Sequence, residues 1–157
     1  MTIAIHWPGV ESPLTNRAQR VLQLAAGNVA ARFNHEEFGT EHILLALMKD
    51  GSGRGVAVLT NLGIDLRRLW LDVEASIEAF PGMYNRTSAD PTPGAERAVR
   101  YSIDESQALK HDYVGTEHLL LGLFREQEGI ASRVLRTAGL TLDLLRAAVQ
   151  EIVAKRM

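Results

Sequence analysis

The sequence contains no cysteine, which excludes disulfide bonds, thiolate metal sites and cysteine nucleophiles. It has no apolar run near the ~20 residues that a membrane-spanning helix needs. Its first residues, 1–13, lack the basic start and apolar stretch of a signal peptide. The formal charge of −2 gives no general attraction to nucleic acid or to an anionic membrane surface. These absences predict a cytoplasmic protein that binds neither nucleic acid nor membranes.

Nucleotide-binding and catalytic signatures are absent as well. The pattern G-x-x-x-x-G-K-[ST] does not occur, and the glycine-rich stretch 51–55 has no lysine. No serine or lysine has the local context of an activated nucleophile. His35 and His42 lie near acidic residues, but they are seven residues apart (42 − 35) rather than four apart on a helix. We therefore expect no catalytic residue, no cofactor and no metal site, and we expect His42 and His118 to be structural.

What the sequence does contain is a duplication. Residues 39–47, in which Gly-Thr-Glu-His precedes an apolar run, return as residues 115–123 at an offset of 76 residues (115 − 39). The register continues without a gap from 39–63 to 115–139, and 11 of these 25 pairs are identical. A match of this length at a fixed register indicates an internal repeat, so the chain is predicted to consist of two similar halves.

Each half has the hydrophobic spacing of four helices, and no strand is expected. The central helices, 40–49 and 116–126, follow the Gly-Thr-Glu-His string and are apolar on all sides, which indicates complete burial. The threonine of the string is expected to cap each of them. The other helices are predicted to start near residues 15, 54 and 65 in the first half and near residues 93, 130 and 142 in the second. The predicted fold class is all-α, with two four-helix repeats related by a pseudo-twofold axis.

The chain divides into an arm and one domain. Residues 1–13 are predicted to form an irregular N-terminal arm, and residues 14–157 the domain. Within the domain the first repeat covers about 14–79 and the second about 92–155. The linker between them, about 80–91, is marked by proline, glycine, asparagine and serine.

These patterns resemble the Clp repeat domain, the N-terminal domain of ClpC- and ClpA-type AAA+ unfoldases. The likeness rests on the doubled Gly-Thr-Glu-His string, on Thr-x-Arg-Ala at 15–18 and on the Thr92-Pro93 helix start, and it covers about residues 14–154. In that family the domain is not the motor. It is a pseudo-twofold helical module that receives substrates and adaptor proteins for the ATPase ring, so the resemblance implies a non-catalytic recognition role.

The resemblance also implies two pockets for phosphorylated arginine. Each uses a threonine at the start of a repeat's first helix and the glutamate of the string, which alignment places at Thr15 with Glu41 and at Thr92 with Glu117. A helix N-terminus and a threonine hydroxyl can bind a phosphate, and a carboxylate can bind a guanidinium. The alternative is that the threonines only cap helices and the glutamates only oppose the helix macrodipole.

The two repeats differ at these places. The first has one residue more between its threonine and its glutamate (41 − 15 = 26, against 117 − 92 = 25). This shifts the register in or after the first helix, so phosphoarginine is expected to bind more tightly to the Thr92/Glu117 pair. Where the family tends to have an aromatic residue before each threonine, this chain has Leu14 and Pro91. An apolar lip for peptides or cyclic peptide ligands is therefore expected to be altered.

Three hypotheses for the function follow. The first is a module that recruits phosphoarginine-bearing or unfolded substrates, or Clp adaptor proteins, to a ClpC-type ATPase. The second is a free-standing regulator that sequesters adaptors, substrates or antibiotic-like cyclic peptides from that ATPase. The start at Met1 and the end at Met157 favour the second, whereas continuation into an ATPase module would favour the first. The third, a small helical enzyme, has no support in the sequence.

Overall fold

The computed structural model describes residues 14–29, 37–79 and 90–155 of the chain. The expected N-terminal arm, His35 and most of the expected linker lie outside these residues. The described part contains eight α-helices, one π-helical turn and two strands of two residues each. No helix in these ranges is long and apolar enough to cross a membrane. The all-α fold class is confirmed, although the two short strands were not expected.

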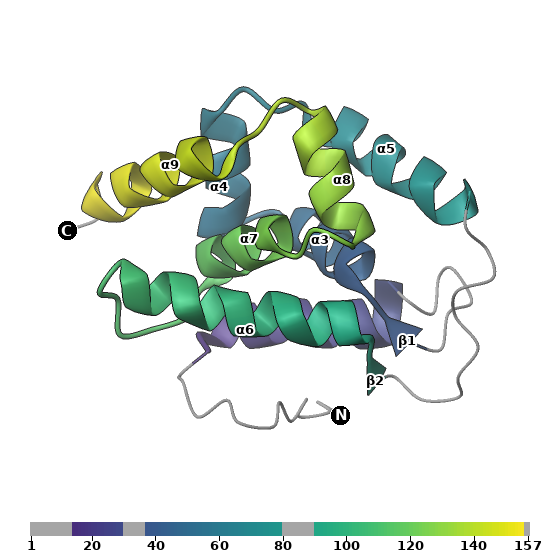
Figure 1. The fold of residues 1–157 in the computed structure, drawn as a ribbon, viewed down its shortest axis with the longest axis horizontal. Coiled ribbons are helices and arrows are strands. Elements are labelled where there is room, and N and C mark those ends of the chain that lie inside the picture. The colour runs from purple at the N-terminus through teal and green to yellow at the C-terminus, as the bar shows by residue number, and fades with distance from the viewer. Residues whose placement is uncertain (1–13, 30–36, 80–89, 156–157) are drawn as a thin grey trace.

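The helices follow the same order in both halves (Figure 1). The first half consists of α1 (Asn16–Leu24), the π-helical turn η1 (Ala25–Val29), β1 (Glu37–Phe38), α3 (Thr40–Asp50), α4 (Arg54–Asn61) and α5 (Leu66–Ala79). The second half consists of β2 (Asp90–Pro91), α6 (Pro93–Ala108), α7 (Thr116–Arg125), α8 (Ile130–Thr137) and α9 (Leu142–Lys155). Helices α1, α3, α4 and α5 therefore correspond to α6, α7, α8 and α9, which confirms two four-helix repeats.

The ends of several helices follow directly from the sequence. Thr15 and Thr92 are the N-caps of α1 and α6, and each hydroxyl accepts the backbone N–H three residues further on at 3.1 Å. Pro93 takes the first position of α6, where its missing N–H costs nothing. Gly63 and Gly139 follow α4 and α8 with φ of 79° and 93°. Glycine adopts this left-handed conformation without strain, so both short helices end there.

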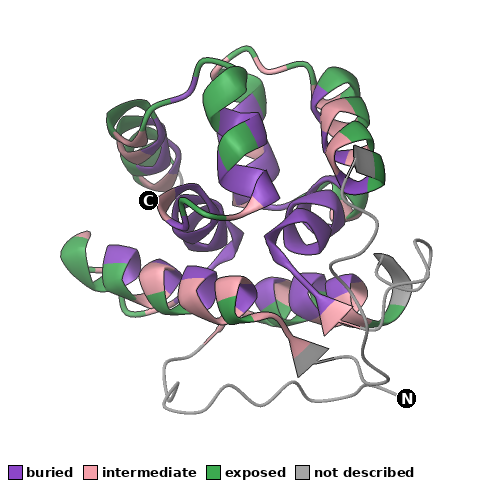
Figure 2. Ribbon diagram, turned by 45° about the vertical axis from the view of Figure 1, so that its right-hand side comes forward, coloured by how far each residue is buried: buried purple, intermediate pink, exposed green. Residues whose placement is uncertain are grey.

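Helices α3 and α7 form the centre of the domain. All residues of Thr40–Met48 and Thr116–Phe124 are buried, as the central purple helices of Figure 2 show. Helices α1 and α6 form a layer on one side of them, and α4, α5, α8 and α9 cover the other side (Figure 1). Because α4 packs against α9 and α5 against α8, each repeat completes the core of the other. Leu45 and Leu121, both fully buried, each stabilise this shared core by about 1.5–3 kcal/mol.

The extra residue of the first repeat falls in the segment that contains η1. Counted from the threonines, Ala25 aligns with Ser102 at an offset of 77 (102 − 25), whereas Phe38 aligns with Val114 at 76 (114 − 38). The π turn lies between these points, while α6 is α-helical throughout. A π turn closes i→i+5 hydrogen bonds, so it takes up one residue more than an α turn. The predicted register shift is thus located between Ala25 and Phe38, the segment that begins with the π turn.

The short strands join the two repeats. Strands β1 and β2 pair in parallel, with Phe38 opposite Pro91, and an isolated parallel bridge joins Leu14 to Val114. These two pairings are equivalent under the repeat register. In each, the segment before one repeat's first helix lies beside the segment before the other repeat's Gly-Thr-Glu-His string.

Backbone hydrogen bonds fix these contacts at the helix starts. The Thr92 N–H donates to the Phe38 carbonyl, and the Thr15 N–H donates to the Val114 carbonyl, both at 2.9 Å. The start of α6 is therefore held beside the start of α3, and the start of α1 beside the start of α7.

Candidate functional site

The glycine of the Gly-Thr-Glu-His string makes room for the glutamate that follows it. A Cβ on Gly39 would lie 2.1 Å from Oε1 of Glu41, and one on Gly115 would lie 2.2 Å from Oε1 of Glu117. Both distances are far inside van der Waals contact. The absence of a glycine side chain therefore lets each carboxylate fold back over the start of its own helix.

The histidine of the string caps the helix from inside. Nδ1 of His42 accepts the backbone N–H of Gly39 at 2.8 Å, and Nδ1 of His118 accepts that of Gly115 at 2.9 Å. Both rings are fully buried. Burial lowers the pKa of His118 to about 4, so this ring is neutral and its Nδ1 can accept. The predicted structural role of both histidines is confirmed.

The threonine of the string does not cap its helix, contrary to expectation. The preceding glycine is the N-cap, and the threonine is the first helical residue. Its hydroxyl instead accepts a backbone N–H from the first turn of a neighbouring helix. Thr116 accepts from Gly55 of α4 at 3.0 Å, and Thr40 accepts from Ala131 of α8 at 3.4 Å. Each threonine thus ties a central helix to the other repeat.

The four candidate binding residues lie in two pockets, and each pocket combines both repeats. Thr15 and Glu117 line one of about 410 Å³, the Glu117 pocket, and Thr92 and Glu41 line one of about 520 Å³, the Glu41 pocket. The pairing expected within each repeat is wrong. Helices α6 and α7 form an antiparallel pair, so their starts lie at opposite ends, and the short strands bring each helix start to the other repeat.

In the Glu117 pocket the glutamate has partners within the domain. Nη1 of Arg54 lies 3.2 Å from Oε2 of Glu117, and the Tyr113 hydroxyl donates to the same oxygen at 3.0 Å. Arg54 also donates to the Tyr113 hydroxyl at 2.7 Å. Burial, reinforced by the Glu117 charge, raises the pKa of Tyr113 to about 12, so its hydroxyl stays protonated and can donate. The carboxylate is held in a closed triangle of side chains.

A second arginine also lines the Glu117 pocket. Arg17, in the first turn of α1, pairs with Asp50 at 3.0 Å and also donates to the Ser52 hydroxyl. The pocket is therefore lined by two arginines, Arg17 and Arg54, and one glutamate. This lining, together with the N-terminus of α1, gives the pocket a positive character.

In the Glu41 pocket the glutamate has no such partners. Glu41 is 3% exposed, and burial raises the pKa of its carboxyl group to about 7. The carboxylate accepts a hydrogen bond from its own backbone N–H. Nδ1 of His42 lies 3.9 Å away, but it accepts from Gly39 and so presents no proton to the carboxylate. In the described part of the chain, no lysine or arginine pairs with Glu41.

The repeat register shows why the two pockets differ. Arg54 corresponds to Ile130 (54 + 76), and Tyr113 corresponds to Glu37 (113 − 76). The two partners of Glu117 are thus replaced by an apolar residue and by a second acid. Five glutamates and one arginine line the Glu41 pocket. Neither Arg54 nor Tyr113 was expected from the sequence as a site residue, yet both stand where the aligned repeats differ, and that difference is the signal that could have identified them.

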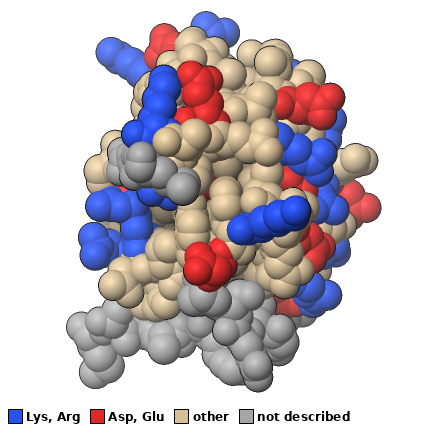
Figure 3. Space-filling view, turned by 90° about the vertical axis from the view of Figure 1, so that its left-hand side faces the viewer, with Lys and Arg blue, Asp and Glu red and all other residues tan. Residues whose placement is uncertain are grey.

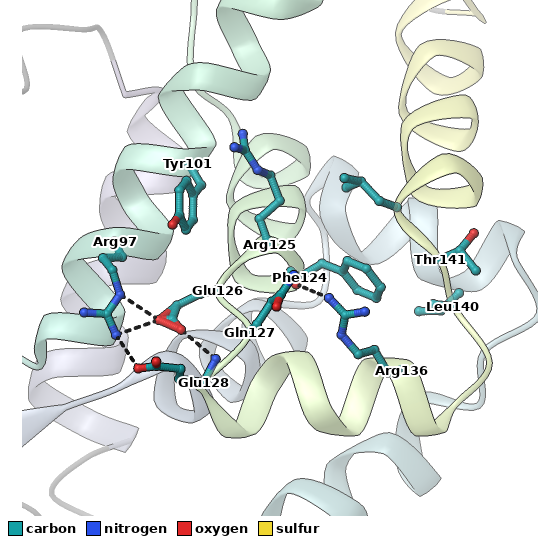
Figure 4. A pocket seen from close by; sticks show the side chains of 11 residues that line it. Arg97, Tyr101, Phe124, Arg125, Glu126, Gln127, Glu128, Arg136, Leu140 and Thr141 are labelled. Carbon is teal, nitrogen blue, oxygen red and sulfur yellow. Dashed lines mark hydrogen bonds and ion pairs between the residues drawn. The ribbon is translucent and has the colours of Figure 1, made fainter.

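An open pocket of about 820 Å³ adjoins the Glu41 pocket, between α6, the connection from α7 to α8, and the start of α9 (Figure 4). Arg97 stands in the wall that the two share, and it pairs with Glu126 at 3.1 Å and Glu128 at 3.4 Å. Arg136 lies over the ring of Phe124, 4.4 Å from its centroid. The arginines that line this open pocket therefore already have partners within the domain.

Buried charges elsewhere in the described residues are paired. Glu105, 2% exposed, accepts from Arg146 at 2.8 Å and from Arg125 at 3.0 Å, and Arg146 holds the pKa of Glu105 below its usual range. On the face drawn in Figure 3, acidic and basic side chains are intermixed and form no large patch of one sign. No group of three acidic or histidine side chains in the described ranges is placed to hold a metal ion.

Fold and pockets together define a helical two-repeat domain with its pockets at the junctions of the repeats. The chain belongs to the Clp repeat (R) N-terminal domain family, whose profile matches residues 13–138 and 91–157. It is 42% identical over 139 residues to chaperone protein ClpB of Oceanobacillus iheyensis and to the negative regulator of genetic competence ClpC/MecB of Bacillus subtilis. Each alignment covers 88% of this chain and 17% of the relative, so the chain spans a small part of these curated proteins.

Solved structures agree with this assignment. The Hsp104 N-terminal domain from Candida albicans superposes with a TM-score of 0.72, covering 90% of this chain and 91% of that chain at 17% identity. The N-terminal domain of the chaperone ClpD from Arabidopsis thaliana gives a TM-score of 0.66 at 22% identity, with 90% and 94% covered. At these identities the likeness shows the fold.

Proposed function

We propose that this domain is a non-catalytic recognition module of a cytoplasmic Clp protein-degradation system. It would receive protein substrates or adaptor proteins for a ClpC-type ATPase. The proposed ligand of the Glu117 pocket is phosphoarginine on marked proteins, bound by Thr15 and Glu117. Thr92 and Glu41 of the second pocket are proposed to bind another part of the same protein ligand. Membership of the Clp repeat family supports the role, and the two pockets at helix starts support the ligand class.

The composition of the Glu117 pocket carries the proposal. Phosphoarginine joins a planar guanidinium to a phosphate, so its site needs an acid and an anion-binding group close together. The Glu117 carboxylate can take the guanidinium in a charged hydrogen bond. The first turn of α1, with the Arg17 side chain, can take the phosphate.

Arg54 has a part in this binding. In the free domain its guanidinium lies against Glu117, where the ligand's guanidinium would bind. The arriving phosphate offers Arg54 a new partner within the same pocket. Binding would therefore replace the Arg54–Glu117 ion pair by two others, Glu117 with the ligand's guanidinium and Arg54 with its phosphate. No buried charge would be left unpaired.

Calorimetry with phosphoarginine tests the proposal. Glu117→Gln removes the charge that faces the guanidinium and is expected to weaken binding by about 1.5–3 kcal/mol, the range for a hydrogen bond to a charged group. Glu151→Gln, at an exposed glutamate of α9 that pairs with Lys155, is the charge-matched control and should bind as the wild type does. Absence of phosphoarginine binding to the wild type, or equal binding by Glu117→Gln, would contradict the proposed ligand.

A further inference from the structure

We infer that the Glu41 pocket binds an unphosphorylated arginine or lysine side chain of the protein ligand, with the Glu41 carboxylate as its counter-ion. The inference rests on the proposed function, because it assigns different ligands to the two pockets of one recognition module. The Glu117 pocket would take phosphoarginine, and the Glu41 pocket a side chain that carries positive charge alone.

The first argument is the missing partner of Glu41. Glu105, Glu117 and Glu126 are each at most 2% exposed, and each has at least one arginine within 3.2 Å. Glu41 is equally buried and lines a pocket, yet no cation of the described residues reaches it. A buried carboxylate needs a partner of opposite charge to remain ionised. Because the described residues supply none, we assign that place to the ligand.

The second argument is that this pocket is unsuited to a phosphate. Pro93 has no N–H to donate, and Gly94 stands where α1 has Arg17 (94 − 77). The single arginine of the lining, Arg97, is held by two glutamates, whereas Arg17 of the other pocket has one acidic partner, Asp50. The other charged side chains of the lining are glutamates, which favour a cation over a dianion. The groups that make the Glu117 pocket positive are thus absent here.

The third argument is the fit of an extended side chain. Ile130 takes the place of Arg54 and leaves the space beside the carboxylate open. Together with Pro91 and Pro93 it lines the pocket with apolar surface, against which the methylene groups of arginine or lysine can pack. A volume of about 520 Å³ is ample for one such side chain.

The neighbouring open pocket does not compete for this role. Its arginines are paired inside the domain, with Glu126, Glu128 and Glu105 or over aromatic rings. It presents no unpaired buried charge of the described residues to a ligand. The open pocket can accommodate the residues of the protein ligand that flank the bound side chain, whereas Glu41 binds the charged end of that side chain.

Amide-resolved NMR titration at pH 8 with four small probes tests the inference. The probes are Nα-acetyl-arginine amide, Nα-acetyl-lysine amide, the neutral isostere Nα-acetyl-citrulline amide, and phosphoarginine. The arginine and lysine probes should shift the amides of Thr92, Gly94 and Glu41, and should bind at least about tenfold more tightly than citrulline. Phosphoarginine should shift the amides of Thr15 and Arg17 instead.

Glu41→Gln should weaken the binding of the arginine probe at least about tenfold, while Glu151→Gln should leave its affinity unchanged. The inference is overturned if Glu41→Gln has no effect, if citrulline binds equally well, or if phosphoarginine is the tighter ligand at Glu41. Phosphoarginine binding at Glu117 in any of these cases would leave the proposed function intact. A wild-type domain that binds none of the charged probes would refute both. The spectrum of each variant shows directly that it is folded.

Discussion

The Glu117 pocket and the Glu41 pocket share a backbone plan and differ in how the carboxylate is satisfied. In both, glycine makes room for the glutamate, histidine caps the helix and threonine ties the helix to the other repeat. Beside Glu117 stand Arg54 and Tyr113, and beside Glu41 stand Ile130 and Glu37. The duplication has kept the groups that position the carboxylate and changed the groups that neutralise it.

Because of this difference, the two carboxylates have opposite effects on the stability of the free domain. Glu117 contributes to the fold because Arg54 and Tyr113 satisfy it, but the proposed guanidinium ligand would have to displace Arg54. Binding at Glu41, as proposed, would displace no residue, but the ionised form of Glu41 is unfavourable in the free domain. An unpaired buried charge that lowers stability is typical of a site maintained for function.

The largest expected effect is on stability, with opposite signs in the two pockets. The pKa of Glu41 rises from 4.5 to about 7 on folding. The folded state therefore binds the proton more tightly, and stability from this group is lost as pH rises from 4.5 through 7. At ~1.4 kcal/mol per pH unit, Glu41→Gln should raise the free energy of unfolding at pH 8 by on the order of 3 kcal/mol. Urea denaturation measures this.

Glu117→Gln is the matched variant. It removes the counter-charge of Arg54, whose side chain is partly exposed, and should lower the free energy of unfolding by about 1–2 kcal/mol. At pH 4 the gain of Glu41→Gln should largely vanish, since Glu41 is then protonated in both states. Two variants that shift stability equally and in the same direction would show that the pockets do not differ in this way.

The next effect comes from transferring the partner of one carboxylate to the other. Ile130→Arg places an arginine beside Glu41, at the position that aligns with Arg54, the partner of Glu117. The new guanidinium should occupy the site of the ligand and weaken Nα-acetyl-arginine amide binding by about 2 kcal/mol, roughly 30-fold. Ile130→Leu keeps the position apolar and should bind like the wild type. Undiminished binding by Ile130→Arg, with the variant folded, would show that the position does not control access to Glu41.

The smallest effect is a pH dependence confined to the Glu41 pocket. A cation needs the ionised carboxylate, and with a pKa of about 7 Glu41 is mostly protonated at pH 6 and mostly ionised at pH 8. Binding of the arginine probe should therefore be about tenfold weaker at pH 6 than at pH 8. Among the described residues, the charged groups around Glu41 are Glu37 of β1, Glu96 and Arg97 of α6, and Glu126 and Glu128 after α7. Nδ1 of His42 lies 3.9 Å away and accepts from Gly39.

The matched variant is Glu41→Gln. Its remaining affinity for the arginine probe should not change over the same pH range. NMR titration at several pH values decides the point. If the dependence persists in this variant, Glu41 is not the group responsible for it.

The sequence predicted the fold well because its signals are local. Helix starts at Thr15 and Thr92, helix ends at Gly63 and Gly139, and the apolar central helices each depend on a few neighbouring residues. The internal repeat then implied the symmetric arrangement.

The pairing of the pocket residues was not predictable in the same way. Thr15 and Glu41 share a repeat, and nothing local shows that Thr15 lies beside Glu117 instead. The contacts that decide it, the two-residue strands and the Leu14–Val114 bridge, are too short to produce an alternating hydrophobic pattern. Tertiary topology alone carries this information.

The crossing of the repeats at β1–β2 and at Leu14–Val114 has an evolutionary consequence. Each pocket takes its threonine from one repeat and its glutamate from the other, so a single repeat has no complete pocket. An ancestral single repeat would have needed a symmetric dimer, in which both pockets are identical. There, an arginine at the position of Arg54 would appear in both pockets at once. Joining two copies in one chain lets one pocket keep its internal cation while the other loses it.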